Sequence, residues 1–193
     1  HDALPIYVPM EIYTTMDRSL QNSINEVMNG KDKNGNTVFA WENKFVDAGI
    51  SVVETTTGAI RAIGAGRNHV ATGFNTATDT NKQIGSTAKP LYDYGPGIET
   101  ENWSTYTPWI DQPHTYSDGK TSVVNSDGTY SGFITSRQAL VRSRNIPALK
   151  AFQSLNKNSV TNFVKGLGLH PENPLHESHA IGGYTGESPL SLS

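Results

Sequence analysis

The sequence predicts an α+β fold, because one β-hairpin near the N-terminus is followed by several amphipathic helices. Two runs rich in strand-forming residues, 49–54 and 59–64, flank a turn at residues 55–58 and predict the hairpin. Helices are predicted where apolar residues recur at helical spacing, first at Leu20, Ile24, Val27 and Met28. The 193 residues contain no internal repeat or linker, and they are enough for one domain with a core.

The N-terminal elements follow from their capping residues. Residues 1–9 contain two prolines and are expected to be extended. Thr15 or Asp17 is expected to cap a helix that runs to Met28, and Gly30 is expected to end it. A charged loop precedes the hairpin, and a loop rich in Thr and Asn follows it.

The second half of the chain is predicted to be mainly helical. Residues 100–132 are aromatic and irregular, and we expect them to form a packed loop that borders a cleft. A helix is expected over residues 135–141, followed by an interruption at residues 143–145. Pro147 is expected in the first turn of the next helix, and Ser159 is expected to cap a last one.

Composition excludes several classes of function. The 15 basic and 18 acidic residues give a net charge of −3, which argues against binding to nucleic acid. The sequence has no cysteine, so it can form neither a disulfide nor a thiolate site. It contains no apolar run of membrane-spanning length and no signal peptide, and its start at His1 suggests a trimmed piece of a longer protein.

The most informative motif is S-x-x-K at Ser86 and Lys89. Residues three apart lie on one face of a helix, where a neutral lysine can take the proton of the serine and make its hydroxyl a nucleophile. Gly85 permits a sharp entry turn and Pro90 is tolerated near a first turn, so a helix is expected to start close to Ser86. Burial and the helix N-terminus are expected to lower the pKa of Lys89.

Two further S-x-x-K tetrapeptides lack this context. Ser117 and Lys120 lie in a run rich in Asp, Gly, Ser and Asn, which predicts a loop. Ser154 lies at the end of an apolar-periodic segment, and a helix C-terminus would favour the charged form of Lys157. Neither pair is therefore predicted to be catalytic.

Other sites have less support from the sequence. Three closely spaced histidines, His170, His176 and His179, do not complete the spacing of a zinc site, so no metal is expected. A Ser-His-Asp hydrolase would want a G-x-S-x-G motif, which the sequence lacks. The acidic residues near the motif are interpreted as surface charges: Asp79, Asp93 and Glu99. The aromatic residues between 103 and 130 are interpreted as loop packing.

Ser86 and Lys89 belong to an ordered series of motifs. The series is T-T-M-D at residues 14–17, G-R-N at 66–68, F-N-T-A-T at 74–78, G-S-T-A-K-P at 85–90, D-Q-P at 111–113, S-R-N-I-P-A at 143–148, I-G-G-Y at 181–184 and S-P-L at 188–190. In this order it resembles the transpeptidase domain of bifunctional (class A) penicillin-binding proteins. The resemblance spans almost the whole chain.

The resemblance implies the fold, the site and the partners. The fold would be that of β-lactamases and penicillin-binding transpeptidases, an antiparallel sheet covered by helices with a helical subdomain. Ser86 would be the acyl-accepting nucleophile and Lys89 its general base; Ser143 would relay a proton, and Asn145 would bind Lys89 and the stem-peptide amide. The family cross-links D-Ala-D-Ala stem peptides of peptidoglycan at the extracytoplasmic face of the bacterial membrane, without a cofactor, and is acylated by β-lactams.

Two departures from the family pattern make residues 1–193 a partial transpeptidase domain. The family's upstream glycosyltransferase domain and membrane anchor are not in this sequence. Its third motif, K-T-G or K-S-G, is also absent, since Lys120-Thr121-Ser122 lacks the glycine and precedes the second motif. We therefore expect a second chain to supply that strand, and we expect residues 1–193 alone not to fold stably.

Three functions remain open on these grounds. The first is a D,D-transpeptidase. The second is a serine β-lactamase or D,D-carboxypeptidase, which shares Ser86 and Lys89 but must activate a water. The third is a β-lactam-binding sensor module that is acylated and reacts no further. Product analysis with a stem-peptide donor distinguishes them.

Overall fold

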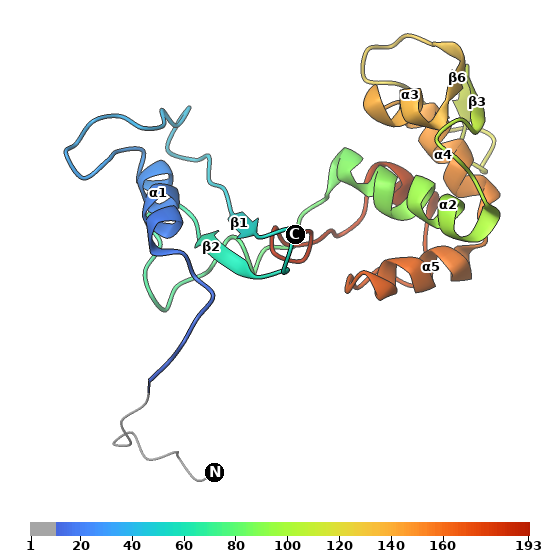
Figure 1. Ribbon diagram of the computed structural model, residues 1–193. Helices are drawn as coiled ribbons and strands as arrows, with labels where there is room; N and C mark the ends of the chain where they lie inside the picture. Colours follow the sequence, from blue (N-terminus) through green and yellow to red (C-terminus); the bar gives the residue numbers. More distant parts are fainter. Residues whose placement is uncertain (1–10) are drawn as a thin grey trace. The chain divides into compact units, whose positions relative to one another are not determined.

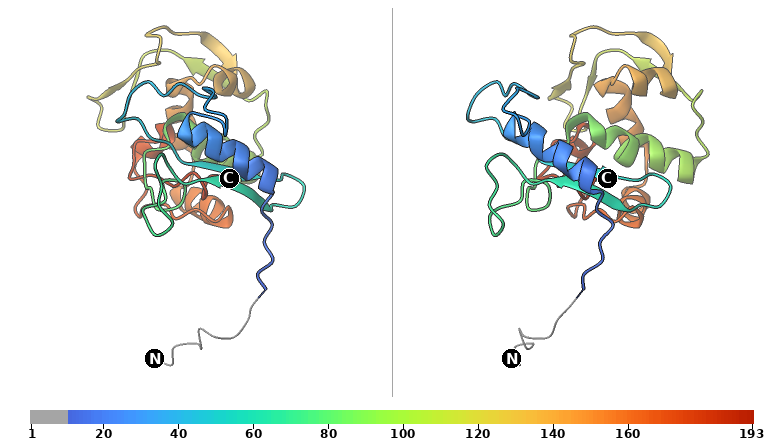
Figure 2. Two further views of the ribbon diagram at one scale, coloured as in Figure 1. Left: turned by 90° about the vertical axis from the view of Figure 1, so that its left-hand side faces the viewer. Right: turned by 60° about the vertical axis from the view of Figure 1, so that its left-hand side comes forward.

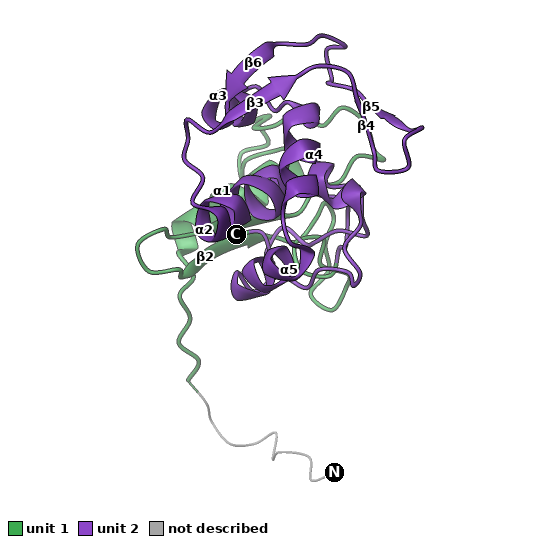
Figure 3. Ribbon diagram, turned by 90° about the vertical axis from the view of Figure 1, so that its right-hand side faces the viewer, with its two compact units in different colours: residues 1–79, 193 green, residues 80–192 purple. Residues whose placement is uncertain are grey.

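The computed structural model describes residues 11–193, which fall into two compact units (Figure 3). The first unit comprises the chain up to Asp79 together with Ser193, and the second runs from Thr80 to Leu192. The expected extended stretch over residues 1–9 lies outside the described residues. Each unit combines helices with antiparallel strands, in agreement with the α+β prediction.

The first unit begins with the predicted helix, α1 (Arg18–Asn29). Its N-cap is Asp17, whose carboxylate accepts a 2.9 Å hydrogen bond from the backbone N–H of Leu20. Gly30 ends the helix with a positive φ of 75°, as its position in the sequence predicts.

The predicted hairpin is formed by β1 (Ile50–Val53) and β2 (Ile60–Gly64), which pair antiparallel. Helix α1 packs against β2 and crosses the hairpin (Figures 1 and 2). Gly64 makes this approach possible, because a Cβ there would lie 2.8 Å from the terminal methyl of Met28. The Gln21 side chain bonds both backbone groups of Ile63, at 2.7 and 2.9 Å, and so ties α1 to β2.

The second unit starts with the segment that carries Ser86. A 3₁₀ turn, η1 (Gly85–Thr87), leads into a π-helix, η2 (Lys89–Tyr94), which continues as α2 (Gly95–Glu101). The predicted helix start is therefore correct in place but wrong in type. Pro90 contributes to the wide turn, since a proline has no N–H to donate to the helix ladder.

Three more α-helices follow in the second unit, α3 (Ser136–Val141), α4 (Asn145–Ser154) and α5 (Lys157–Gly166), and a short 3₁₀ helix, η3 (Glu177–Ile181), comes after them. The cap expected at Ser159 is wrong. Asn156 caps α5 instead, because its side chain accepts hydrogen bonds from the N–H groups of Asn158 and Ser159. None of the helices within residues 11–193 is both long and apolar enough to span a bilayer.

The segment expected to be an irregular loop contains strands of two short antiparallel pairs, one nested within the other in sequence. Strand β3 (Pro108–Asp111) pairs antiparallel with β6 (Gly132–Thr135), and β4 (His114–Thr115) pairs with β5 (Ser122–Val123). The irregular-loop prediction is wrong here because runs of two to four residues carry too little alternation to be recognised.

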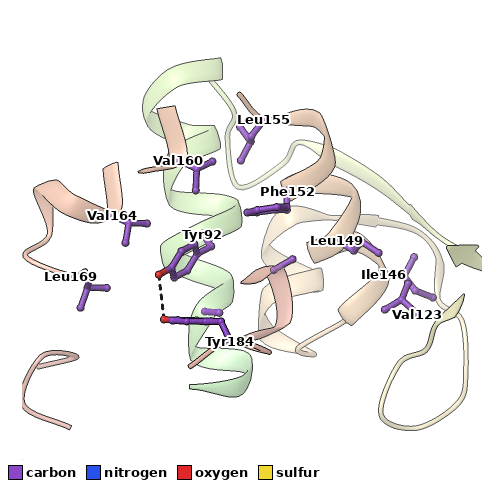
Figure 4. Close-up of a cluster of buried hydrophobic side chains, with 12 residues drawn as sticks. Tyr92, Val123, Ile146, Leu149, Phe152, Leu155, Val160, Val164, Leu169 and Tyr184 are labelled. Atoms are coloured by element: carbon purple, nitrogen blue, oxygen red, sulfur yellow. Dashed lines mark hydrogen bonds between the residues drawn. The ribbon is translucent and has the colours of Figure 1, made fainter. Parts of the chain in front are cut away.

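The core of the second unit lies between η2, α4 and α5 (Figure 4). Its largest fully buried members are Tyr92, Ile146, Leu149, Phe152, Val160 and Val164. The hydroxyl of Tyr92 donates to that of Tyr184 at 3.2 Å, so the polar end of this buried ring has a partner. This packing holds η2, and with it Lys89, against the start of α4.

Candidate active site

Four side chains named from the sequence meet at the amino group of Lys89. Its Nζ lies 3.1 Å from Oγ of Ser86, 2.9 Å from Oγ of Ser143 and 2.7 Å from Oδ1 of Asn145. It also donates to the backbone carbonyl of Ser143 at 2.6 Å. The structure thus brings Ser86, Lys89, Ser143 and Asn145 into one cluster.

Ser86 is held at the surface by a backbone contact. Gly85, just before it, has φ of +54°, and Gly182 has φ of +77°. Gly182 packs directly against the backbone of Gly85, so a Cβ at Gly182 would overlap that backbone. Lys82 and Glu187 exchange backbone hydrogen bonds of 3.0 and 3.3 Å beside this contact. Apart from the two glycines, no sequence pattern indicates this support.

Lys89 is buried while the serine remains exposed. The lysine residue is 0% exposed, and burial lowers its pKa from 10.5 to about 8. The ionised form of Asp93 would oppose this shift, and the positive charge of Arg144 adds to it. A lysine of this pKa has a neutral fraction near neutral pH and can accept a proton. The predicted lowering is found, with burial as its main cause.

Asp93 departs from the interpretation as a surface charge. Asp79 and Glu99 are exposed, as predicted, but Asp93 is fully buried one turn after Lys89. Among the described residues, neither of its carboxylate oxygens has a hydrogen-bond partner. Burial raises the pKa of Asp93 well above its ordinary value, which favours the neutral acid. The interpretation failed because only tertiary packing buries this position.

Ser143 occupies an unusual backbone conformation between α3 and α4. Its φ is +51°, a region that residues with a Cβ rarely adopt. Such strain is found where the surrounding structure holds the residue in place. Here it directs both the hydroxyl and the carbonyl of Ser143 toward the amino group of Lys89.

Asn145, the first residue of α4, is fixed on both sides. Its Nδ2 donates to the carbonyl of Val124 at 2.8 Å, which leaves Oδ1 facing Lys89. Its backbone N–H donates to Oδ1 of Asn125 at 2.8 Å. These contacts cap α4 from a distant loop, a role that residue spacing did not reveal.

The two other S-x-x-K pairs are engaged elsewhere. The Ser117 side chain hydrogen-bonds Glu177, in a loop as predicted. The hydroxyl of Ser154, at the end of α4, donates to the carbonyl of Ala151 at 2.8 Å. The ammonium of Lys157 donates to the carbonyl of Leu155 at 3.0 Å.

The remaining candidates have structural roles. The ring of His179 is buried and stacks on Tyr184 at 4.6 Å. Within the part of the chain that the structure describes, no group of His, Asp and Glu side chains is arranged to hold a metal ion. Trp103 and Trp109 pack edge to face at 5.0 Å beside the buried cluster, as loop packing predicts, whereas Tyr106 is exposed.

Sequence comparison places these motifs in a known context. The family model "Penicillin binding protein transpeptidase domain" matches residues 48–190. A penicillin-binding protein 1A/1B of Bacillus subtilis (strain 168) is 44% identical over 188 residues, which is 95% of this chain and 20% of that protein. A penicillin-binding protein 1A of Streptococcus pneumoniae (strain ATCC BAA-255 / R6) is 33% identical over 184 residues, 93% of this chain and 25% of that protein. The chain therefore spans a quarter or less of either relative.

Solved structures agree on the fold. Penicillin-binding protein 1A from Haemophilus influenzae aligns with a TM-score of 0.69 and 25% identity, covering 83% of this chain and 24% of that one. The PonA1 protein from Mycobacterium tuberculosis, in complex with penicillin V, aligns with a TM-score of 0.71 and 20% identity. The latter match covers 92% of this chain and 48% of that one.

Proposed function

The chain belongs to the family of penicillin-binding protein transpeptidase domains, and from this membership we propose that it carries the serine acyl-enzyme site of a peptidoglycan D,D-transpeptidase. The observation that supports the proposal most directly is the contact of one buried lysine with Ser86, Ser143 and Asn145. The donor substrate is the D-Ala-D-Ala end of a stem peptide, and the acceptor is an amine on a neighbouring strand.

The proposed reaction begins with proton transfer from Ser86 to Lys89. As the proton leaves for Nζ, Oγ attacks the carbonyl carbon of the penultimate D-Ala and forms a tetrahedral intermediate. The intermediate collapses when the C–N bond breaks, and the terminal D-Ala leaves with a proton that Ser143 relays from Lys89. The acceptor amine then attacks the acyl-enzyme, returns its proton to the same relay and frees Ser86.

Each remaining contact has a role in this scheme. The pKa of Lys89, about 8, leaves about one tenth of the lysine neutral at pH 7, which is enough for a general base. Ser143 lies within hydrogen-bond distance of Nζ, where a proton relay has to be. Asn145 anchors Nζ through Oδ1. Its proposed contact with the amide of the stem peptide is inferred from the family resemblance.

A β-lactam would follow the first half of the same reaction. Its strained amide mimics the D-Ala-D-Ala end, so Ser86 opens the ring and keeps the acyl group. The proposed partners are therefore stem peptides and β-lactams. The proposed location is the extracytoplasmic face of a bacterial membrane.

The proposal also includes a partner for the β1–β2 hairpin. In the described residues this sheet has two strands, whereas isolated two-stranded sheets are marginally stable. A K-T-G or K-S-G strand supplied by another polypeptide segment would extend the sheet. Co-purification of such a segment with this chain, and its cross-linking to the hairpin, would test this part of the proposal.

Intact-protein mass spectrometry after penicillin treatment tests the site. In the protein with the complete domain we expect one adduct, which peptide mapping assigns to Ser86. Ser86→Ala should abolish it, whereas Ser154→Ala, the matched change in a second S-x-x-K pair, should leave it unchanged. Equal labelling of the Ser86→Ala variant would refute the proposal. With a stem-peptide donor, cross-linked product supports a transpeptidase, hydrolysed product a carboxypeptidase or β-lactamase, and neither product a sensor.

A further inference from the structure

A buried polar network lies behind the Ser143–Asn145 loop and takes no direct part in the proposed reaction. Arg144, the middle residue of the loop, points away from Lys89 into the protein. Its Nε donates to Asp111 at 2.7 Å and its Nη1 donates to Asp127 at 2.7 Å. Its Nη2 donates to the carbonyl of Thr129. The loop thus presents its outer residues to the lysine and anchors its middle residue in the interior.

Asp111 is the centre of this network. Its side chain is 0% exposed, whereas that of Asp127 is 52% exposed, so the two carboxylates hold the same guanidinium in different environments. Asp111 also accepts a 2.8 Å hydrogen bond from Nδ2 of Asn125 and a 2.9 Å bond from the N–H of Ser131. Burial opposes ionisation, but these bonds and Arg144 outweigh it and lower the pKa of Asp111.

Asn125 connects Asp111 to the start of α4. Asp111 binds the Nδ2 of Asn125, which leaves Oδ1 free to accept the N–H of Asn145 at 2.8 Å and that of Ile146 at 3.3 Å. The preceding residue, Val124, accepts from Nδ2 of Asn145. Asn145 is half-buried and Ile146 is buried, so their backbone N–H groups would otherwise lack a partner.

We propose that Asp111 is a positioning residue for acyl transfer: through Arg144 and Asn125 it holds the loop that supplies three contacts of the proposed catalytic lysine. This inference rests on the proposed function. Ser143 has a strained backbone that local sequence does not stabilise, so its geometry depends on the anchored neighbour. A loop that moved by about 1 Å would cost up to about 100-fold in rate.

The positive charge of Arg144 also affects the pKa of Lys89. Two ionisable groups act on Lys89: Asp93, in the same helix, raises the lysine pKa in its ionised form, and Arg144 lowers it. Around Arg144 the charged groups are Asp111 and Asp127, and Lys150 also interacts with Asp111. Removing the charge of Arg144 should therefore raise the pKa of Lys89 and move the acid limb of the rate profile to higher pH.

The test measures the acylation rate by penicillin against pH in the protein with the complete domain. Asp111→Asn should lower the rate about 10- to 100-fold. Asp127→Asn is the matched control, with an equal distance to Arg144 but an exposed side chain, and should stay within about twofold. Arg144→Gln should lower the rate and move the acid limb upward, whereas Arg144→Lys should lower the rate without moving it.

Two further measurements keep the inference falsifiable. If Asp111→Asn does not fold, Asn125→Ala replaces it, because that change keeps the Asp111–Arg144 pair and removes the bonds to α4, together with the bonds that Asn125 itself donates to Asp111 and Thr129. An NMR titration of the Lys89 side chain reports its pKa without any acylation. Folded Asp111→Asn with a wild-type rate, or Arg144→Gln with an unmoved titration, would overturn the inference. If the wild-type protein is never acylated but Arg144→Gln still shifts the Lys89 titration, the proposed function alone is overturned.

Discussion

The pH dependence of acylation follows from the burial of Lys89. Burial lowers the pKa of the lysine from 10.5 to about 8, so protonation removes the base as the pH falls through that value. The neutral fraction is about one half at pH 8, about one tenth at pH 7 and about one hundredth at pH 6. We therefore expect the acylation rate to fall about tenfold between pH 7 and pH 6.

The same calculation compares the neutral fraction of the buried lysine with that of an exposed lysine. At the ordinary pKa of 10.5, about one lysine in 3,000 is neutral at pH 7. The buried lysine is therefore neutral roughly 300 times more often at that pH. Lys89→Arg should remove nearly all activity, because a guanidinium does not lose its proton in this range.

The assay is the second-order rate of adduct formation with a β-lactam, followed by intact mass from pH 5.5 to 9. Circular dichroism at each pH shows that the protein remains folded. Lys157→Arg is the matched control, since Lys157 also belongs to an S-x-x-K pair and burial also lowers its pKa. We expect the control to behave as the wild type. A rate that is flat between pH 6 and 8, or an active Lys89→Arg variant, would refute the assignment of the base.

Three further substitutions test a backbone contact beside the site, the packing of the core and the cap of α1. Gly182→Ala places a Cβ in the backbone of Gly85 and should reduce acylation strongly while the fold is retained, measured by adduct rate and circular dichroism. Phe152→Ala removes a fully buried ring and should lower the free energy of unfolding in urea by about 3–5 kcal/mol. Asp17→Ala removes the N-cap of α1 and should cost about 1 kcal/mol in the same assay, and no loss would mean that the cap is not needed.

Local rules predicted the elements whose ends are set by nearby residues. Helix α1 begins at the cap provided by Asp17 and ends at Gly30, and both signals are contained in the helix's own sequence. The β1–β2 hairpin is likewise defined by two short alternating runs around a turn. Strands β3 to β6 were missed because each pairs through two to four residues with a partner that no local pattern identifies.

The sequence predicted the four side chains that cluster at the candidate site, but not the buried residues that hold them in place. The context of the S-x-x-K motif and the resemblance to an ordered series of family motifs predicted Ser86, Lys89, Ser143 and Asn145, and the structure brings these four residues together. The burial of Asp93 and the Asp111–Arg144 pair depend on contacts between residues far apart in the chain. Such contacts leave no periodic signal, so reasoning from the sequence assigned Asp93 to the surface.

The chemistry of Lys89 is a consequence of core packing rather than of the motif alone. The same tetrapeptide pattern occurs three times in the sequence, yet only the Ser86–Lys89 pair has its lysine fully buried beside a second serine and an amide. Tyr92, three residues later, lies in the core between α4 and α5, so the contacts that stabilise the unit also exclude water from Lys89. Substitutions that loosen this core should therefore raise the pKa of Lys89 toward 10.5 and slow acylation before the protein unfolds.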